Sequence, residues 1–558
     1  MPSVSNWETA AAAKRDAVEQ KLASYDYKLP DVSSKVLDVT SVPLDDVLTP
    51  KQLEITTSEL DVLLDKLQKG EWKAVEVTEA FCYRAVIAHS LVNCLNEVFF
   101  EKALARAKEL DEVFKTSGPV GALHGLPISL KNQISVEGED TNMGYTGWIG
   151  RVAKQDSVLA ASLRKQGAIL YCITNVPQSL MSSETKNNIY GLTVNPFNRN
   201  ISCGGSSGGE GALIGFRGSP AGFGSDIGGS VRIPAAYNGL YGFRGSYNRL
   251  PYGGSVNSCE GLEAVSSVLG PLTVSMSGLS TLVKAVLASE PWRADPLCQH
   301  IPWRDELYHL AEHGGEGAQL CFGLLKDNGL VKPCPPYERA MEMTRKALEA
   351  KGHKVVEWTF PKAGEMMNIL NAIYTADGGA DIDAACALSG EPRLFNMFEG
   401  DEKLPHLSTY EYWQLCSKRR TFLTAQLAAW EATSSLTGTG RPFDALITPI
   451  APYPSFAHGT AQDISYTGLS NLNDFPTAVV PVTRVDPSLD ASYPRQEYHD
   501  YDPLNTGTSF DRVNWERYDP EFFKNCPISL QVLGRKGEDE AVIRMTEVVD
   551  EALKSQKV

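Results

Sequence analysis

The N-terminal part of the chain shows the apolar spacing of amphipathic helices. Within residues 56–70, leucines stand at positions 60, 63, 64 and 67, which places them on one helical face. Thr56 and Glu59 have the spacing of a capping box before that face, and Gly70 follows it as a stop signal. Similar patterns in residues 74–89 and 101–114 predict two more helices. We therefore expect a helical N-terminal part.

The residues that follow show a different pattern, in which short apolar runs alternate with amphipathic segments. Residues 126–130 (LPISL) predict a strand that leads directly to Lys131. Residues 156–174 predict a helix capped by Asp156 and stopped at Gly167, followed by a strand. Residues 444–449 (DALITP) predict another buried strand. This alternation predicts an α/β sheet whose faces are covered by helices.

The longer-range pattern divides the chain into two regions. We expect residues 1–75 to form an N-terminal helical extension packing on the core, and residues 76–558 to form a single large domain. Within this domain, residues from about 290 to 435 carry more charge and fewer strand signals, which predicts a helical insertion. Residues 488–523 are rich in proline and tyrosine and are expected to form an extended excursion.

Composition excludes several classes of partner. The chain of 558 residues has 52 basic and 68 acidic side chains, so it lacks the basic excess typical of nucleic-acid binding. Its eleven cysteines form no CxxC pair and are expected to be reduced, mostly buried thiols. No apolar run approaches the roughly 18 residues of a membrane span, and the N-terminus lacks a signal-peptide pattern. We expect a cytoplasmic protein without a membrane span.

Residues 202–215 (SCGGSSGGEGALIG) surround two adjacent serines with glycines. A flexible linker is disfavoured, because a second glycine-rich segment interleaved with apolar residues follows and indicates close backbone approach. A phosphate-binding loop is disfavoured, because neither the Gly-Lys-Ser/Thr ending nor the GxGxxG spacing is present. A hydrolase nucleophile elbow fits residues 205–209, with Ser207 as nucleophile and His458 or His499 as base. The elbow stays open as an alternative.

A fourth interpretation uses three segments together. Residues 124–138 (HGLPISLKNQISVEG), 203–215 (CGGSSGGEGALIG) and 225–244 (SDIGGSVRIPAAYNGLYGFR) follow one another in an order and spacing that resemble the amidase signature family. The resemblance continues through residues 173–198, 474–483 and 526–543, and so covers nearly the whole chain after about residue 50. Within the family, the chain is similar to fungal acetamidase-type enzymes and to the soluble part of fatty acid amide hydrolases.

The resemblance implies a fold, a reaction and a set of residues. The fold is a large mixed β-sheet core covered by helices on both faces. The reaction is the hydrolysis of small to medium carboxamides through an acyl-enzyme intermediate, with no cofactor and no metal. Lys131 matches the family's base, Ser206 the serine that relays the proton, and Ser230 the nucleophile. The relay serine follows a cis peptide bond in the family, which here would join Gly205 and Ser206.

Further residues are implied around these three. The resemblance assigns Ser207 and Arg232 supporting roles, and by position Leu180, Met181 and Tyr374 are candidates for the substrate pocket. The backbone N–H groups expected to bind the oxyanion are those of Ile227, Gly228, Gly229 and Ser230.

Other interpretations remain beside this one. Lys131 and Arg232 could be solvated surface charges, and Ser230 could be a turn residue or a helix cap. The chain could be the amidase subunit of a glutamine-dependent amidotransferase, an inactive binding protein, or an ester, carbamate or fatty-amide hydrolase. Residues 395–414 are charged and offer no amphipathic face for a bilayer, which weighs against a membrane-delivered lipid. We also leave open whether the protein forms a homodimer.

Overall fold

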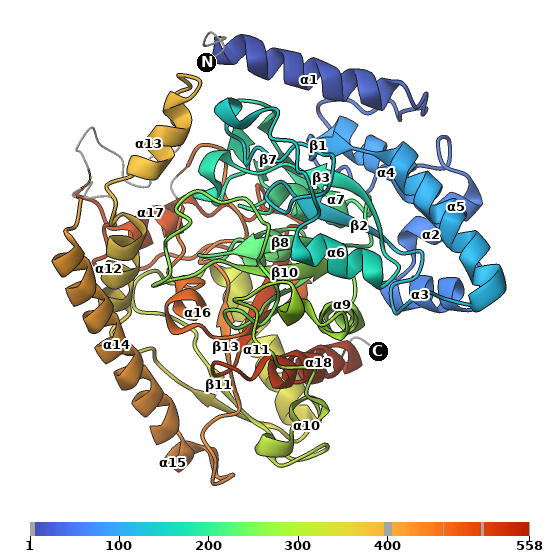
Figure 1. The fold of residues 1–558 in the computed structure, drawn as a ribbon. Coiled ribbons are helices and arrows are strands. Elements are labelled where there is room, and N and C mark those ends of the chain that lie inside the picture. The colour runs from blue at the N-terminus through green and yellow to red at the C-terminus, as the bar shows by residue number, and fades with distance from the viewer. Residues whose placement is uncertain (1–5, 395–403, 405, 461, 504–506, 557–558) are drawn as a thin grey trace.

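The computed structural model describes residues 6–394, 404, 406–460, 462–503 and 507–556. A mixed sheet of eleven strands lies at the centre of this described part, in the order β1-β3-β2-β8-β10-β9-β14-β15-β13-β11-β12 (Figure 1). The predicted α/β fold with a large mixed sheet is confirmed. The strands are β1 (Leu95–Val98), β2 (Pro127–Lys131), β3 (Ile169–Thr174), β8 (Ala221–Asp226), β9 (Tyr241–Arg244), β10 (Val268–Thr273), β11 (Cys321–Leu324), β12 (Lys354–Glu357), β13 (Ala445–Pro449), β14 (Thr477–Arg484) and β15 (Pro527–Leu533).

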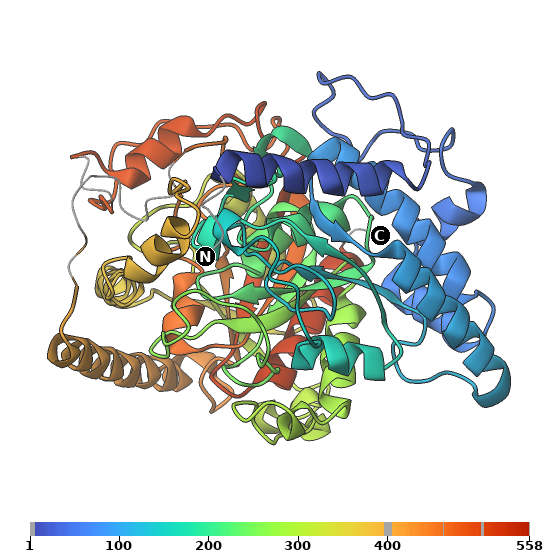
Figure 2. The ribbon, with the colours of Figure 1, turned by 45° about the horizontal axis from the view of Figure 1, so that its top comes forward.

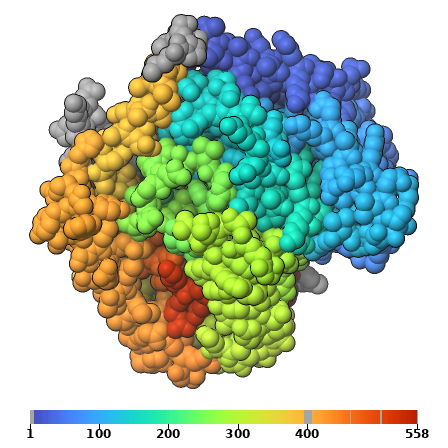
Figure 3. All heavy atoms as spheres, in the orientation of Figure 1, coloured from blue at the N-terminus to red at the C-terminus, as the bar shows by residue number. Residues whose placement is uncertain are grey.

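Helices cover the sheet, and Figure 2 shows α1 running across the upper part of the molecule, with the other N-terminal helices, in lighter blue, mainly to its right. In the space-filling view of Figure 3 the N-terminal residues, in blue, lie opposite the orange segment that contains α14 and α15. Short strand pairs lie outside the sheet: β4 (Lys186–Asn187) with β5 (Gly191–Leu192), and β6 (Val194–Asn195) with β7 (Asn198–Ser202). The helices are α1 (Trp7–Ala23), α2 (Pro50–Thr57), α3 (Leu60–Gln68), α4 (Ala74–Val92), α5 (Phe100–Ser117), α6 (Val158–Lys165), α7 (Gly208–Gly215), α8 (Arg232–Tyr237), α9 (Met276–Ala288), α10 (Asp305–Tyr308), α11 (Pro335–Ala350), α12 (Ala363–Tyr374), α13 (Ala380–Ala387), α14 (Thr409–Ala432), α15 (Ser434–Thr437), α16 (Gly468–Asn473), α17 (Phe510–Arg517) and α18 (Asp539–Ser555).

Parallel pairing brings two strand ends to the same edge of the sheet. Strand β2 runs parallel to both β3 and β8, and Leu130 of β2 pairs with Phe223 of β8. Parallel neighbours need crossover connections, which here contain α6 between β2 and β3 and α7 before β8. Because parallel strands end at the same edge, Lys131, the last residue of β2, lies near Asp226, the last residue of β8.

At two helix starts, the residue predicted to cap the helix is not the one that caps it in the structure. The predicted leucine face is correct, since all four leucines of α3 are buried. Thr56, however, lies inside the preceding helix and donates to the Gln52 carbonyl, whereas the capping box joins Thr49 and Gln52 at the start of α2. Ser157 caps α6 in place of Asp156, which binds Arg164 instead. Neighbouring polar residues compete for a cap, and the backbone conformation decides between them.

Residues 290–435 are not purely helical. They contribute β11 and β12 to the sheet, with α11 as the crossover between these parallel strands. Each strand is only four residues long and has no alternation, so periodicity alone could not reveal it.

The segment 395–414 is described only in part. Residues 395–403 and 405 lie outside the described residues. Tyr410 and Trp413, in the first turns of α14, are 68% and 65% exposed, so the described end of the segment is more apolar than expected.

The predicted free thiols are present. All eleven cysteines are free, and nine of them are buried. In the described ranges, no helix has the length and apolar character needed to cross a bilayer.

Candidate active site

Lys131 is completely buried at the end of β2. Its Nζ lies 2.6 Å from Ser206 Oγ and 2.7 Å from Ser225 Oγ. Burial lowers the pKa of Lys131 to about 7, against the raising effect of the Asp226 and Glu210 carboxylates. The interpretation of Lys131 as a solvated surface charge is therefore excluded.

The glycine-serine segment is rigid and buried. The Gly205–Ser206 peptide bond is cis, as the resemblance implied, and Ser206 is 1% exposed. A Cβ at Gly209 would lie 2.3 Å from the Asn175 backbone nitrogen, so α7 approaches the end of β3 too closely for a side chain. Ser207 donates from its backbone N–H to the Ser230 carbonyl and from its hydroxyl to the Ser225 carbonyl. The structure thus joins the two serine segments directly.

Ser230 lies in the loop between β8 and α8 and is 8% exposed. Asp226 fixes this loop, because its carboxylate accepts hydrogen bonds from the N–H groups of Gly229 (2.9 Å) and Val231 (3.1 Å). Arg232, which is fully buried, donates to both oxygens of Asp226 at 3.0 Å and holds the pKa of that carboxyl well below its usual range. Arg232 therefore supports the loop and is not a surface charge.

The expected oxyanion donors need one correction. The N–H group of Gly229 already donates to Asp226, so it is not free. Among the described residues, nothing accepts from the N–H groups of Ile227, Gly228 and Ser230. Gly229 has a φ of +125°, and a Cβ there would lie 2.7 Å from Thr467 Oγ1, so the loop requires glycine. No pattern in the sequence indicates that Gly229 pairs with Asp226.

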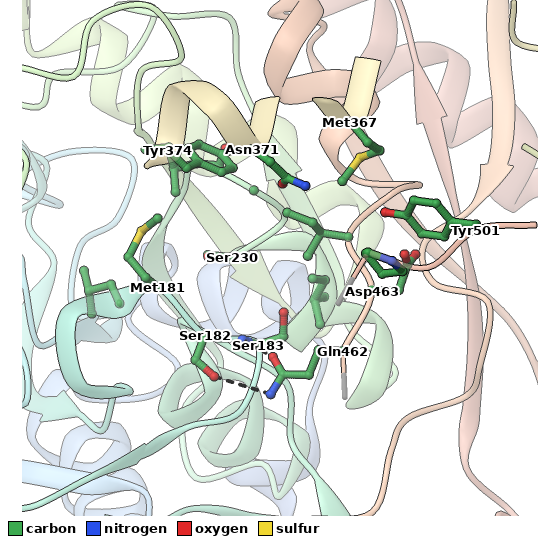
Figure 4. A pocket seen from close by; sticks show the side chains of 16 residues that line it. Met181, Ser182, Ser183, Ser230, Met367, Asn371, Tyr374, Gln462, Asp463 and Tyr501 are labelled. Carbon is green, nitrogen blue, oxygen red and sulfur yellow. Dashed lines mark hydrogen bonds between the residues drawn. The ribbon is translucent and has the colours of Figure 1, made fainter. Parts of the chain in front are cut away.

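A mostly apolar pocket of about 130 Å³ opens onto Ser230 (Figure 4). The candidates Leu180, Met181 and Tyr374 all line it. Tyr374 also donates its hydroxyl to the Ile227 carbonyl at 2.5 Å and so contacts the Ser230 loop. The full lining is Leu180, Met181, Ser182, Ser183, Ile227, Gly228, Ser230, Ile233, Met367, Asn371, Tyr374, Gln462, Asp463, Ile464, Tyr501 and Pro503.

A second pocket of about 30 Å³ adjoins the first at Ser230. Ser206, Ser225 and Ser230 all line this smaller pocket, so these three serines face one space. In the described part of the chain no hydrogen bond joins Ser206 to Ser230 directly. Hydrogen bonds of a reaction centre often tighten only when substrate binds.

Comparison with known proteins identifies the family. The family profile described as Amidase matches residues 76–543. The chain belongs to the amidase family. It is 41% identical over 493 residues to an acetamidase of Aspergillus oryzae, covering 88% of this chain and 89% of the relative. It is 42% identical over 493 residues to an acetamidase of Emericella nidulans, covering 88% of each chain. The fatty acid amide hydrolase structure superposes with a TM-score of 0.88 at 30% identity, covering 98% of this chain and 95% of that one.

The predicted recognition and enzyme class are thereby confirmed: the chain is an amide-hydrolysing enzyme of the amidase family. Structures with lower identity share the fold, among them a crystal structure of an amidase with a TM-score of 0.68 at 22% identity.

Sequence reasoning missed three polar residues of this amidase site. Ser225 contacts Lys131, Asp226 anchors the Ser230 loop, and buried Glu210 accepts from the hydroxyls of Ser129 (2.6 Å) and Thr174 (2.7 Å). Burial raises the pKa of Glu210 to about 8, so this carboxyl is largely neutral at neutral pH. Glu210 and Asp226 could have been found from the sequence, because each is an acidic residue inside a glycine-rich apolar segment.

In this amidase fold, neither histidine considered for the nucleophile-elbow alternative is in contact with Ser207. His458 contacts Glu184 and the Arg199 carbonyl, and His499 contacts Asp327. Ser207 is fully buried, and its hydroxyl bonds to a carbonyl of the adjacent strand β8. Neither histidine is therefore placed to activate it.

Proposed function

We propose that this enzyme hydrolyses small to medium carboxamides to a carboxylic acid and ammonia or an amine, with Ser230 as nucleophile, Ser206 as proton relay and Lys131 as base. The observation that carries the proposal is the buried contact between Lys131 and Ser206 beside the pocket that holds Ser230. A lysine acts as a base only when it is neutral, and a pKa of about 7 makes it so in much of the protein at neutral pH. The acetamidase names of the relatives agree with small substrates.

The reaction follows from this order of groups. Ser230 Oγ attacks the amide carbon while its proton passes to Ser206, whose own proton passes to Lys131. Reversal of the relay protonates the departing nitrogen, and the C–N bond breaks to leave an acyl ester on Ser230. Water then attacks the ester, gives its proton to the same relay, and releases the acid with Ser230 restored.

The negative charge that forms on the carbonyl oxygen needs donors. The N–H groups of Ile227, Gly228 and Ser230 are unpaired in the described structure and belong to one loop, so we assign the oxyanion to them. Asp226 accepts from the N–H groups of Gly229 and Val231, and Tyr374 donates to the Ile227 carbonyl, so both keep this loop in place before substrate binds. Donors that are already fixed lower the barrier without reorganisation during the reaction.

The two pockets assign the two halves of the substrate. The leaving nitrogen must face Ser206, which lines the pocket of about 30 Å³, so this pocket takes the leaving group. The acyl group then occupies the larger pocket of about 130 Å³. The small volume favours primary amides and release of ammonia over bulky amines.

The test combines labelling with a substrate panel. Ser230→Ala should abolish both amide hydrolysis and acylation by a fluorophosphonate probe, while Ser207→Ala should still label. Labelling of Ser230→Ala but not of Ser207→Ala would establish the elbow instead. A panel of amides, esters and carbamates of graded acyl length, read by product mass, then gives the substrate class. Glutaminase activity with a co-purifying partner and no hydrolysis of simple amides would establish the amidotransferase alternative.

We further propose that residues 1–75 are an extension packed on one domain of residues 76–558, which agrees with a family match that begins at residue 76. A cytoplasmic location and a homodimeric state stay predictions.

A further inference from the structure

One part of the acyl pocket carries polar groups that the proposed reaction does not use. Asp463, Tyr501 and Asn371 line this pocket together with Ser230. In Figure 4, Asp463 and Tyr501 lie together to one side of Ser230, with Met367 near them. Asp463 also raises the pKa of Tyr501, in addition to the larger effect of burial, as expected of two neighbouring acidic groups.

The hydrogen bonds to the Asp463 carboxylate involve only one of its two oxygens. Oδ1 accepts from the Ser465 backbone N–H at 3.0 Å and from the Ser465 hydroxyl at 2.6 Å. Within the described ranges no hydrogen bond to Oδ2 is present, and Asp463 forms part of the pocket wall. Asp463 is 5% exposed, and no described Lys, Arg or His forms an ion pair with it.

A buried carboxylate without a cation is costly, because it loses hydration and gains no opposite charge. Burial raises the pKa of Asp463 to about 6, so the group is still mostly ionised above neutral pH. The other buried acids near the site are compensated: Asp226 by Arg232, and Glu210 by two hydroxyl donors. Asp463 differs because its free oxygen faces a substrate pocket.

We propose that Asp463 binds an ammonium group carried by the acyl part of the substrate, so that aliphatic amides with a terminal amine are the preferred class. This inference rests on the proposed amide hydrolysis. The pocket wall contributed by Ile233, Ile464 and Met367 suits the methylene chain between the carbonyl and the amine. An ammonium donates three hydrogen bonds, and the Tyr501 hydroxyl and the side-chain amide oxygen of Asn371 are acceptors in the same pocket.

The experiment compares matched pairs of primary amides at pH 8. Each ω-amino alkanamide, from 3-aminopropanamide to 6-aminohexanamide, is paired with the neutral alkanamide of the same heavy-atom count. At this pH, Asp463 is ionised and the substrate amine is protonated. We expect kcat/KM of the amino member to exceed that of its neutral partner by about tenfold or more at the chain length that reaches Asp463, as for a hydrogen bond to a charged group.

Asp463→Asn separates recognition from folding. Asparagine keeps the oxygen that accepts from Ser465 and therefore keeps the local turn, but it removes the charge. The variant should lose the preference for amino substrates by about tenfold and change kcat/KM of neutral amides less than about threefold. Glu290→Gln removes one charge from the exposed surface and should leave the ratio unchanged, which controls for long-range attraction.

The outcomes are distinct. Hydrolysis of neutral amides without preference at any chain length overturns this inference and leaves the proposed function intact. An equal loss on both substrates in Asp463→Asn assigns Asp463 a purely structural role and also overturns it. Failure to hydrolyse any amide overturns the proposed function and the inference together.

Discussion

The lowered pKa of the Lys131 ammonium group predicts how the activity of the enzyme depends on pH. If neutral Lys131 is the base, kcat/KM must rise with pH as the ammonium loses its proton. With a pKa of about 7, roughly one tenth of the enzyme is active at pH 6 and roughly nine tenths at pH 8. The expected profile therefore climbs about tenfold between these values and is flat above them. The activity rises with pH because the protonated form of Lys131 is the inactive one. The lowered pKa makes the neutral base available in the physiological pH range.

Lys131→Met tests the origin of this rise. Methionine has a similar length and suits the apolar surroundings at the end of β2, so the variant should fold. Loss of the base should lower kcat/KM by about 10² to 10⁴, and the residual activity should not show the rise near pH 7. Lys115→Met, which changes an exposed lysine, should retain the full wild-type profile.

The assay is hydrolysis of one neutral primary amide, followed by ammonia release from pH 5.5 to 9 at constant ionic strength. Folding of each variant is checked by circular dichroism. A flat wild-type profile between pH 6 and 8 would refute the role of Lys131. So would a rise near pH 7 that persists in Lys131→Met, because another group would then be titrating.

Three further predictions concern the groups around Lys131, Ser206 and Ser230. Glu210→Gln replaces a carboxyl that is largely neutral at neutral pH, so the acidic limb of the profile should stay close to its wild-type position; a clear shift to lower pH would mean that Glu210 is ionised and raises the pKa of Lys131. Arg232→Met leaves the Asp226 carboxylate buried without its cation and should lower the free energy of unfolding in urea by about 3–5 kcal/mol, whereas exposed Arg293→Met should not; equal effects would mean that the buried pair contributes little. Tyr374→Phe removes the hydroxyl that donates to the Ile227 carbonyl and should lower kcat about threefold to tenfold with little change in KM; an effect on KM alone would place Tyr374 in binding only.

Local patterns predicted the fold class and many of the elements. The strand before Lys131, the strand at residues 444–449 and the leucine face of α3 agree with the structure, because each has a strong apolar signal. The strands β11 and β12 were missed, because a strand of four residues is too short to show a period. Exact caps were also missed, since they depend on dihedral angles that neighbouring polar residues could adopt equally well.

The candidate site was predictable only through the family resemblance. The resemblance pointed to Lys131, Ser206 and Ser230. In the structure Ser206 and Ser230 line one small pocket, and Lys131 contacts Ser206. No local pattern distinguishes Lys131 from the other lysines, since its burial and its two hydroxyl contacts arise from the pairing of β2 with β8. The bond between Gly229 and Asp226 likewise depends on the loop conformation and not on residue type.

The buried acids and bases of this protein differ in whether neighbouring groups neutralise their charge. Those that are neutralised hold the structure, and those that are not remain available for chemistry. Asp226 is surrounded by donors, including both arms of Arg232, so its charge is fully used in holding the Ser230 loop. Lys131 has hydroxyl contacts and no ion pair in the described structure, and its pKa falls to where a proton can be exchanged. Asp463 is the acidic counterpart of Lys131, since one oxygen lacks any described donor and faces the pocket. The criterion that supports Lys131 as the proposed base therefore also supports Asp463 as the residue proposed to select the substrate.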